Sequence, residues 1–231
     1  MNRYAMRKSS LSEYRAVIFD LDGTLYYQKP FRIRMLFYLL GHIIQHPSSI
    51  GDVFLIKRYR EVREKWETYE QALSFPADMS LEDRQYLFVA EEKKVPAKRV
   101  EEAVRFYMQK APLTLLPAYK DAILAETIEL LKKKDISIVV YSDYPVEDKL
   151  RALGIKADLC FTSADEQINC MKPDPKGLKV ILETLNLNAA DAVMVGDRYE
   201  KDGLAAIGNK MDYIIVPSSV KEREKMKGLL V

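Results

Sequence analysis

The sequence predicts an α/β protein whose core is a doubly wound parallel sheet, with an all-helical domain inserted near its start. Short β-branched and apolar runs alternate with helical patterns over the C-terminal half, which is typical of parallel strands covered by helices on both faces. A similar run lies near the N-terminus, and the long stretch between the two regions is helical in pattern. The 231 residues suffice for one large domain or two small ones.

The elements of the core follow from local patterns. Residues 16–19 (A-V-I-F) form a β-branched and aromatic run that ends at acids, which indicates a buried strand. Further strands are expected at Ile136–Tyr141, Leu159–Thr162, Ala192–Val195 and Tyr213–Val216. Helices are expected at Lys120–Lys134, Glu147–Leu153, Lys176–Leu185 and in a short segment after Asp202. We therefore assign 1–27 and 113–231 to the α/β core and 28–112 to the helical domain.

The insert carries helical signals and one unusually apolar stretch. In Ile56–Ala72, opposite charges recur four residues apart, and the segment 78–83 (D-M-S-L-E-D) is typical of a helix start. Phe31–Ile44 is the most apolar stretch of the chain, and no acid occurs between Asp22 and Asp52. We interpret Phe31–Ile44 as a buried helix flanked by bases. A surface that contacts substrate or a membrane, and a dimer contact, are the alternatives.

Composition and charge narrow the expected partners and compartment. The formal net charge is +2, so the charge balance does not call for nucleic acid, a membrane or an acidic partner. The two cysteines, Cys160 and Cys170, lack zinc-site spacing and are interpreted as reduced thiols. We recognise no secretory signal and no apolar run of about 20 residues. We expect a cytoplasmic protein, monomer or homodimer, that binds neither nucleic acid nor a membrane.

Polar side chains follow several of the apolar runs. They are Asp20-Leu21-Asp22-Gly23-Thr24, Ser142, Lys172 in M-K-P-D-P, and Asp197 with Asp202 in G-D-R-Y-E-K-D. Because the carboxyl ends of parallel strands meet at one edge of a sheet, we expect these side chains to converge. Each has an ordinary explanation when taken alone, such as a turn, a helix cap or a solvated loop. Their joint occurrence at strand ends points to a site.

The chemistry of these groups favours a metal and a phosphate. Several carboxylates at one edge repel each other unless a cation lies between them, and oxygen ligands suit Mg²⁺. A lysine and a small hydroxyl provide the positive charge and donors that a phosphate needs. One aspartate close to both could attack phosphorus, and a second could protonate the leaving oxygen and later take a proton from water.

This set of motifs resembles the haloacid dehalogenase-like (HAD) superfamily of phosphohydrolases. The family's first motif, an apolar strand ending in D-x-D-G-T, is matched by residues 20–24. Its second motif, a Ser or Thr at a strand end, is matched by Ser142, and its third, a lysine, by Lys172. Its fourth motif is matched by Asp197 and Asp202. The resemblance covers about 14–27 and 115–217.

The resemblance implies a Rossmann-like core with a helical cap domain between the first and second motifs. It implies that Asp20 is the nucleophile and Asp22 the general acid/base. It places Mg²⁺ on Asp20, the main-chain carbonyl of Asp22, and Asp197. Asp202 would reach the metal through water or orient Lys172.

The resemblance also assigns phosphate binding to Ser142, Lys172 and Thr24. Dehalogenases of the family lack the second aspartate, so the presence of Asp22 favours phosphoryl transfer. We therefore expect a Mg²⁺-dependent phosphohydrolase that cleaves a small phosphorylated metabolite through an aspartyl phosphate. A phosphomutase of the same fold and a non-catalytic protein that binds or senses a phosphate ligand are the alternatives. Asp143 departs from the family, which often has Asn after the hydroxyl of the second motif.

Overall fold

The computed structural model describes residues 4–70, 75–76 and 78–230. The chain forms two compact units, one made of Met1–Phe31 and Leu116–Val231 and the other of Arg32–Leu115. Helix α1 (Gln28–Gln45) begins in the first unit and continues into the second. From the sequence, we placed the insert at 28–112.

The first unit is built on one sheet. In the described part of the chain, six strands pair in the order β1-β6-β5-β2-β3-β4. Their bounds are Tyr4–Ala5 (β1), Ala16–Phe19 (β2), Ser137–Ser142 (β3), Leu159–Thr162 (β4), Ala192–Gly196 (β5) and Asp212–Ile215 (β6). All neighbouring pairs are parallel except β1 with β6, which is antiparallel. This arrangement confirms the predicted α/β fold. The edge strand β1 was not predicted, because two residues are too short to carry a strand pattern.

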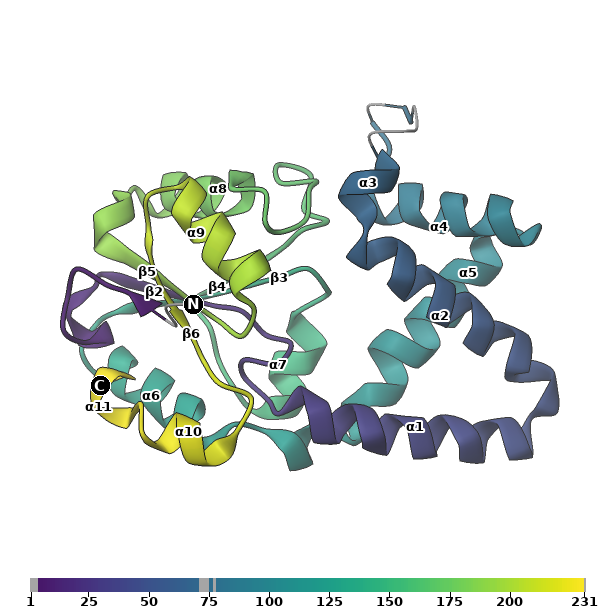
Figure 1. Cartoon of the computed structure of the whole chain (residues 1–231), viewed down its shortest axis with the longest axis horizontal. Helices are drawn as coiled ribbons and strands as arrows, with labels where there is room; N and C mark the ends of the chain where they lie inside the picture. The colour runs from purple at the N-terminus through teal and green to yellow at the C-terminus, as the bar shows by residue number, and fades with distance from the viewer. Residues whose placement is uncertain (1–3, 71–74, 77, 231) are drawn as a thin grey trace. The chain divides into compact units, whose positions relative to one another are not determined.

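Helices lie on both faces of this sheet, as Figure 1 shows, with α8 and α9 on one side and α6, α10 and α11 on the other. The bounds of the elements in this unit are η1 Leu11–Glu13, η5 Leu116–Tyr119, α6 Ala122–Lys132, α7 Glu147–Leu153, α8 Lys176–Leu185, η6 Ala189–Asp191, η7 Tyr199–Gly203, α9 Leu204–Gly208, α10 Val220–Glu224 and α11 Lys227–Leu230. Every residue of β2 is buried, which explains its unbroken apolar run.

The second unit consists mainly of helices. They are η2 Pro47–Ser49, α2 Ile50–Glu64, α3 Trp66–Glu70, α4 Leu81–Lys93, α5 Ala97–Val104, η3 Arg105–Lys110 and η4 Ala111–Thr114. The predicted start of α4 is confirmed, because the Ser80 hydroxyl accepts a hydrogen bond from the Asp83 N–H at 3.1 Å. The helix expected over Ile56–Ala72 is interrupted at Lys65, where φ is −112°. Gln71 and Ala72 lie outside the described residues.

The strand order determines where a site can form. The chain runs from β2 to β3 and β4 on one side of β2, and then to β5 and β6 on the other. The direction of winding therefore reverses next to β2. In open α/β sheets, ligands bind beyond the carboxyl ends of the strands at such a reversal. None of the helices in the described part of the chain combines the length and apolarity needed to cross a bilayer.

Candidate active site

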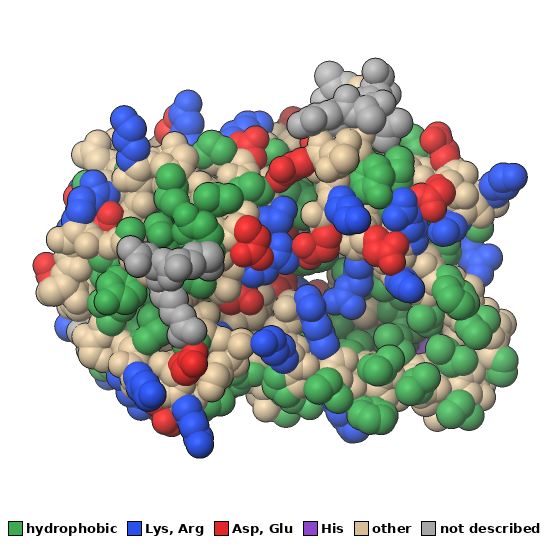
Figure 2. All heavy atoms as spheres, viewed as in Figure 1, with side chains coloured by type: hydrophobic (Ala, Val, Ile, Leu, Met, Phe, Trp, Pro, Cys, Tyr) green, Lys and Arg blue, Asp and Glu red, His purple; other side chains and the backbone are tan. Residues whose placement is uncertain are grey.

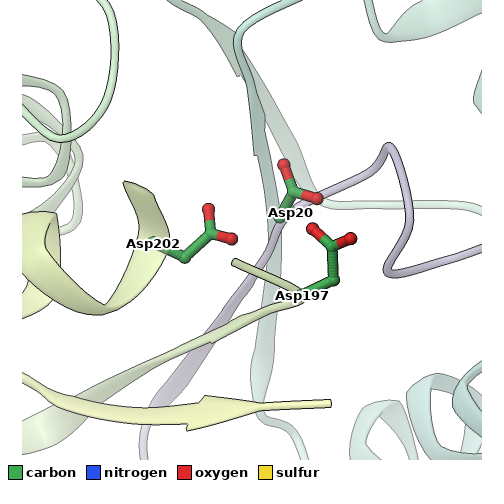
Figure 3. A group of neighbouring side chains, drawn as sticks. All are labelled: Asp20, Asp197 and Asp202. Atoms are coloured by element: carbon green, nitrogen blue, oxygen red, sulfur yellow. The ribbon is translucent and has the colours of Figure 1, made fainter. Parts of the chain in front are cut away.

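Three carboxylates meet at the carboxyl edge of the sheet. Asp20 directly follows β2, Asp197 directly follows β5, and Asp202 comes from the π-helical turn η7. Each offers an oxygen that lies within 4.8 Å of the others. Figure 3 shows these three side chains gathered together, Asp20 and Asp197 beside the strand ends and Asp202 on a helical segment. The convergence expected from the sequence is thus present for these residues.

Two glycines make this close approach possible. Gly23 has φ +100°, and a Cβ at this position would lie 2.1 Å from Asp197 Oδ2. A Cβ on Gly196 would lie 2.2 Å from Asp202 Oδ2. Any larger residue at either position would displace a carboxylate, which gives a steric reason for the G-T and G-D pairs in the motifs.

Lys172 pairs with two of the three acids. Its buried Nζ lies 2.7 Å from Asp20 Oδ1 and 2.6 Å from Asp202 Oδ1. The backbone of this lysine is held by Asp143, whose Oδ1 accepts from the Lys172 N–H at 3.1 Å. Asp143 therefore braces the loop that carries Lys172. Asp202 was expected either to reach the metal through water or to orient Lys172, and its contact with Lys172 is present.

The electrostatics of this cluster favour a divalent cation. Burial raises the pKa of Asp20, and the charge of Lys172 does not offset burial and the repulsion from Asp202 and Asp197. Burial and Asp202 also raise the pKa of Asp197, to about 7. With all groups ionised, three carboxylates and one ammonium would leave two negative charges, which one divalent cation balances. A set of carboxylate oxygens fits Mg²⁺.

Asp22 lies in a different environment, although it is only two residues from Asp20. Its carboxylate is bound by Lys149 Nζ, at 2.6 Å from Oδ1 and 2.9 Å from Oδ2. The hydroxyls of Tyr26 and Ser142 also donate to it, the latter at 3.3 Å. Burial raises the pKa of Asp22, but Lys149 and these hydrogen bonds outweigh burial and lower it. Asp22 is therefore outside the carboxylate cluster, and only its main-chain carbonyl remains for the metal role implied by the family.

Thr24 also has a defined partner. Its hydroxyl is buried and donates to Asp20 Oδ2 at 3.0 Å. This contact orients Asp20, whereas the phosphate-binding role of Thr24 stays a prediction. Ser142 is the last residue of β3, and its Oγ accepts from the Tyr144 N–H at 3.2 Å while donating to Asp22.

Two residues that contact the predicted site were not predicted from the sequence. Lys149 stands in α7, which begins just after β3, so its first turn lies at the same sheet edge. The place of Lys149 in the first turn of a helix that follows a predicted strand could have indicated it from the sequence. Arg223, in α10, donates to the Thr24 carbonyl at 2.6 Å and to the Gly23 carbonyl at 2.5 Å. Its setting in K-E-R-E is typical of an exposed charged helix, so no local signal marked it.

Comparisons with known proteins agree with the motifs. A family profile described as haloacid dehalogenase-like hydrolase matches residues 14–208. A curated mouse (Mus musculus) protein, haloacid dehalogenase-like hydrolase domain-containing protein 3, is 31% identical over 86 residues, 36% of this chain. The match spans 34% of the mouse protein, about a third of its length.

Two solved structures share the fold at low identity. The 2-haloacid dehalogenase of Pseudomonas syringae pv. Tomato DC3000 has a TM-score of 0.59 and 18% identity, with 87% of this chain and 85% of that chain covered. YfnB of Bacillus subtilis, described as a HAD-hydrolase bound to magnesium, has a TM-score of 0.61 and 16% identity. That comparison covers 94% of this chain and 99% of YfnB. At these identities, the likeness shows the fold alone.

Proposed function

Because the chain belongs to the haloacid dehalogenase-like hydrolase family, we propose that it is a Mg²⁺-dependent phosphohydrolase acting on a small phosphate monoester. The observation that carries this proposal is the separation of the two motif aspartates. Asp20 lies in a buried cluster of three carboxylates and contacts Lys172, whereas Asp22 is bound by a different lysine, Lys149. Displacement of a halide from carbon needs neither the second aspartate nor a metal. Phosphoryl transfer uses both.

Asp20 is the proposed nucleophile. Lys172 and Thr24 each hold one of its oxygens, so the carboxylate has a fixed direction before substrate arrives. In the first step, an Asp20 oxygen forms a bond to phosphorus, the bond from phosphorus to the ester oxygen breaks, and Asp22 gives that oxygen a proton. In the second step, Asp22 takes a proton from water, the water oxygen bonds to phosphorus, and Asp20 is released.

The environment of Asp22 suits a proton carrier that responds to substrate. Without substrate, Lys149 keeps the pKa of Asp22 low, so the group is a carboxylate. A phosphate monoester bound beside it brings negative charge and competes for Lys149, and both effects raise the pKa of Asp22. Asp22 would therefore gain the proton it must donate when the substrate is in place.

Mg²⁺ would be held by Asp20, Asp197 and the main-chain carbonyl of Asp22. Asp202 would lie beside these ligands and pair with Lys172. When bound, the ion supplies positive charge against the carboxylates and the phosphate oxygens. Ser142 and Lys172 would bind the transferring phosphoryl group through their donors. The helical unit would act as a cap that selects the substrate, as in the family that the chain resembles.

The direct test is phosphate release from a panel of phosphorylated metabolites, with Mg²⁺ and with EDTA. We expect release from at least one member with Mg²⁺ and none with EDTA. Halide release from 2-haloacids in EDTA would overturn the proposal in favour of a dehalogenase. Isomerisation of a sugar phosphate, or phosphate-ligand binding without turnover, would favour the phosphomutase or the non-catalytic alternative.

Replacing Thr24 with valine separates two roles of its hydroxyl. Since the hydroxyl orients Asp20, Thr24→Val is expected to lower kcat roughly 10- to 100-fold, with little change in KM. Steady-state kinetics on the best substrate measure both constants. A raised KM with unchanged kcat would instead assign the hydroxyl to phosphate binding. Thr184→Val, on the exposed surface of α8, is the matched control and should change neither constant.

A further inference from the structure

Helix α1 exposes a continuous apolar surface, contrary to its expected burial. Phe31 and Met35 are buried, but five other large apolar side chains of the helix are between 49% and 80% exposed. These exposed residues, here called the outer face of α1, are Ile33, Leu36, Phe37, Leu40 and Ile44. Figure 2 shows hydrophobic side chains gathered over α1 at the lower right. The interpretation of Phe31–Ile44 as a buried helix is therefore wrong for this side of the helix.

The spacing of the outer face makes it a single stripe. Its members recur at intervals of three and four residues, so they share one side of the helix. The opposite side packs within the helical unit, where His42 contacts the Tyr107 ring at 5.5 Å and Leu39 joins a cluster around Ile56. A helix that is apolar on both sides normally has both sides covered. Only one side of α1 is covered by its own unit.

Unpaired bases flank the outer face. At about 100° per residue, Arg32 and Arg34 lie on opposite margins of the stripe. Both are exposed, and neither forms an ion pair with any of the described residues. No acid occurs between Asp22 and Asp52, and Asp52 is itself bound by Arg99 at 3.0 Å. The surface thus combines apolar side chains with positive charge that lacks a counter-charge.

From these observations, we propose that the outer face of α1 docks onto an anionic lipid surface. The apolar stripe would enter the boundary between headgroups and acyl chains, and Arg32 and Arg34 would bind lipid phosphates beside it. A second copy of the chain fits less well, because the same face on that copy offers no carboxylate to the two arginines. The proposal replaces the expectation that the protein binds no membrane.

Vesicle co-sedimentation tests the proposal on the intact chain. We expect binding to vesicles that contain phosphatidylserine, weak binding to pure phosphatidylcholine, and loss of binding at high salt. The double variant Arg32→Gln/Arg34→Gln should bind the anionic vesicles roughly 30-fold more weakly. Phe37→Ser/Leu40→Ser should weaken binding by at least about 10-fold, since two inserted side chains are lost.

A matched control separates docking from general loss of apolar surface. Leu130→Ser removes an exposed leucine of α6, in the other unit, and should leave binding unchanged. Failure of the wild type to bind anionic vesicles would overturn the proposal, as would an equal loss in Leu130→Ser. A third result would also overturn it: the wild type forms a dimer in light scattering, Phe37→Ser/Leu40→Ser is a monomer, and the wild type binds no vesicles. The readout is lipid binding, so it is independent of the proposed phosphatase activity.

Discussion

Asp20→Asn is expected to lower kcat for phosphate release by roughly 10⁴-fold or more, because it removes the proposed nucleophile and changes little else. Lys172 keeps its contact with Asp202 at 2.6 Å, so the lysine stays in place. The folded state should not lose stability, since burial already disfavours the charged form of Asp20. Phosphate release by wild type and variant, at saturating Mg²⁺ and substrate, measures the effect.

The exposed Asp148 provides the control for this substitution. It lies on α7 in the same unit, and Asp148→Asn should leave kcat unchanged. Urea unfolding of both variants checks that neither change disrupts the fold. If Asp20→Asn kept more than about one per cent of the wild-type kcat, the nucleophile would have to be another group and the aspartyl-phosphate mechanism would be wrong.

Arg223→Met is expected to destabilise the protein by about 3–5 kcal/mol, because it leaves the buried Asp121 without its charged partner. Arg223 and Asp121 are both almost fully buried, with Nη1 and Oδ2 2.6 Å apart. The same guanidinium donates to the carbonyls of Gly23, Thr24 and Pro217. Its loss would therefore also free the loop that carries Asp22. Urea unfolding followed by circular dichroism measures the change in the free energy of unfolding.

A second substitution at Asp121 distinguishes a buried charge from a general packing defect. Asp121→Asn/Arg223→Met should recover part of the loss, since asparagine carries no charge and still caps α6 through the Leu124 N–H. Arg151→Met, which removes an exposed arginine, should cost no more than about 0.5 kcal/mol. If Arg223→Met lowered the free energy of unfolding as little as Arg151→Met, Arg223 would have no such structural role.

The sequence by itself was sufficient for the fold class and for the three acids that gather at the sheet edge. Strand β2 is buried on both faces, so its apolar run and the acids after it form one local signal. Parallel strands that end in polar residues bring those residues to one edge wherever the strands lie in the sheet. For this reason, Asp20, Asp197 and Asp202 could be placed together before the strand order was known.

Only the tertiary structure decided how each of these groups is paired. Lys149 separates Asp22 from the carboxylate cluster, and Arg223 reaches the Gly23–Thr24 loop from some 200 positions away in the chain. Such contacts depend on which helices pack beside the site, which no local pattern encodes. The exposure of the outer face of α1 likewise depends on which elements pack beside it. An apolar helix side looks the same in sequence whether its own domain covers it or leaves it for a partner, because burial depends on the neighbours that the fold provides.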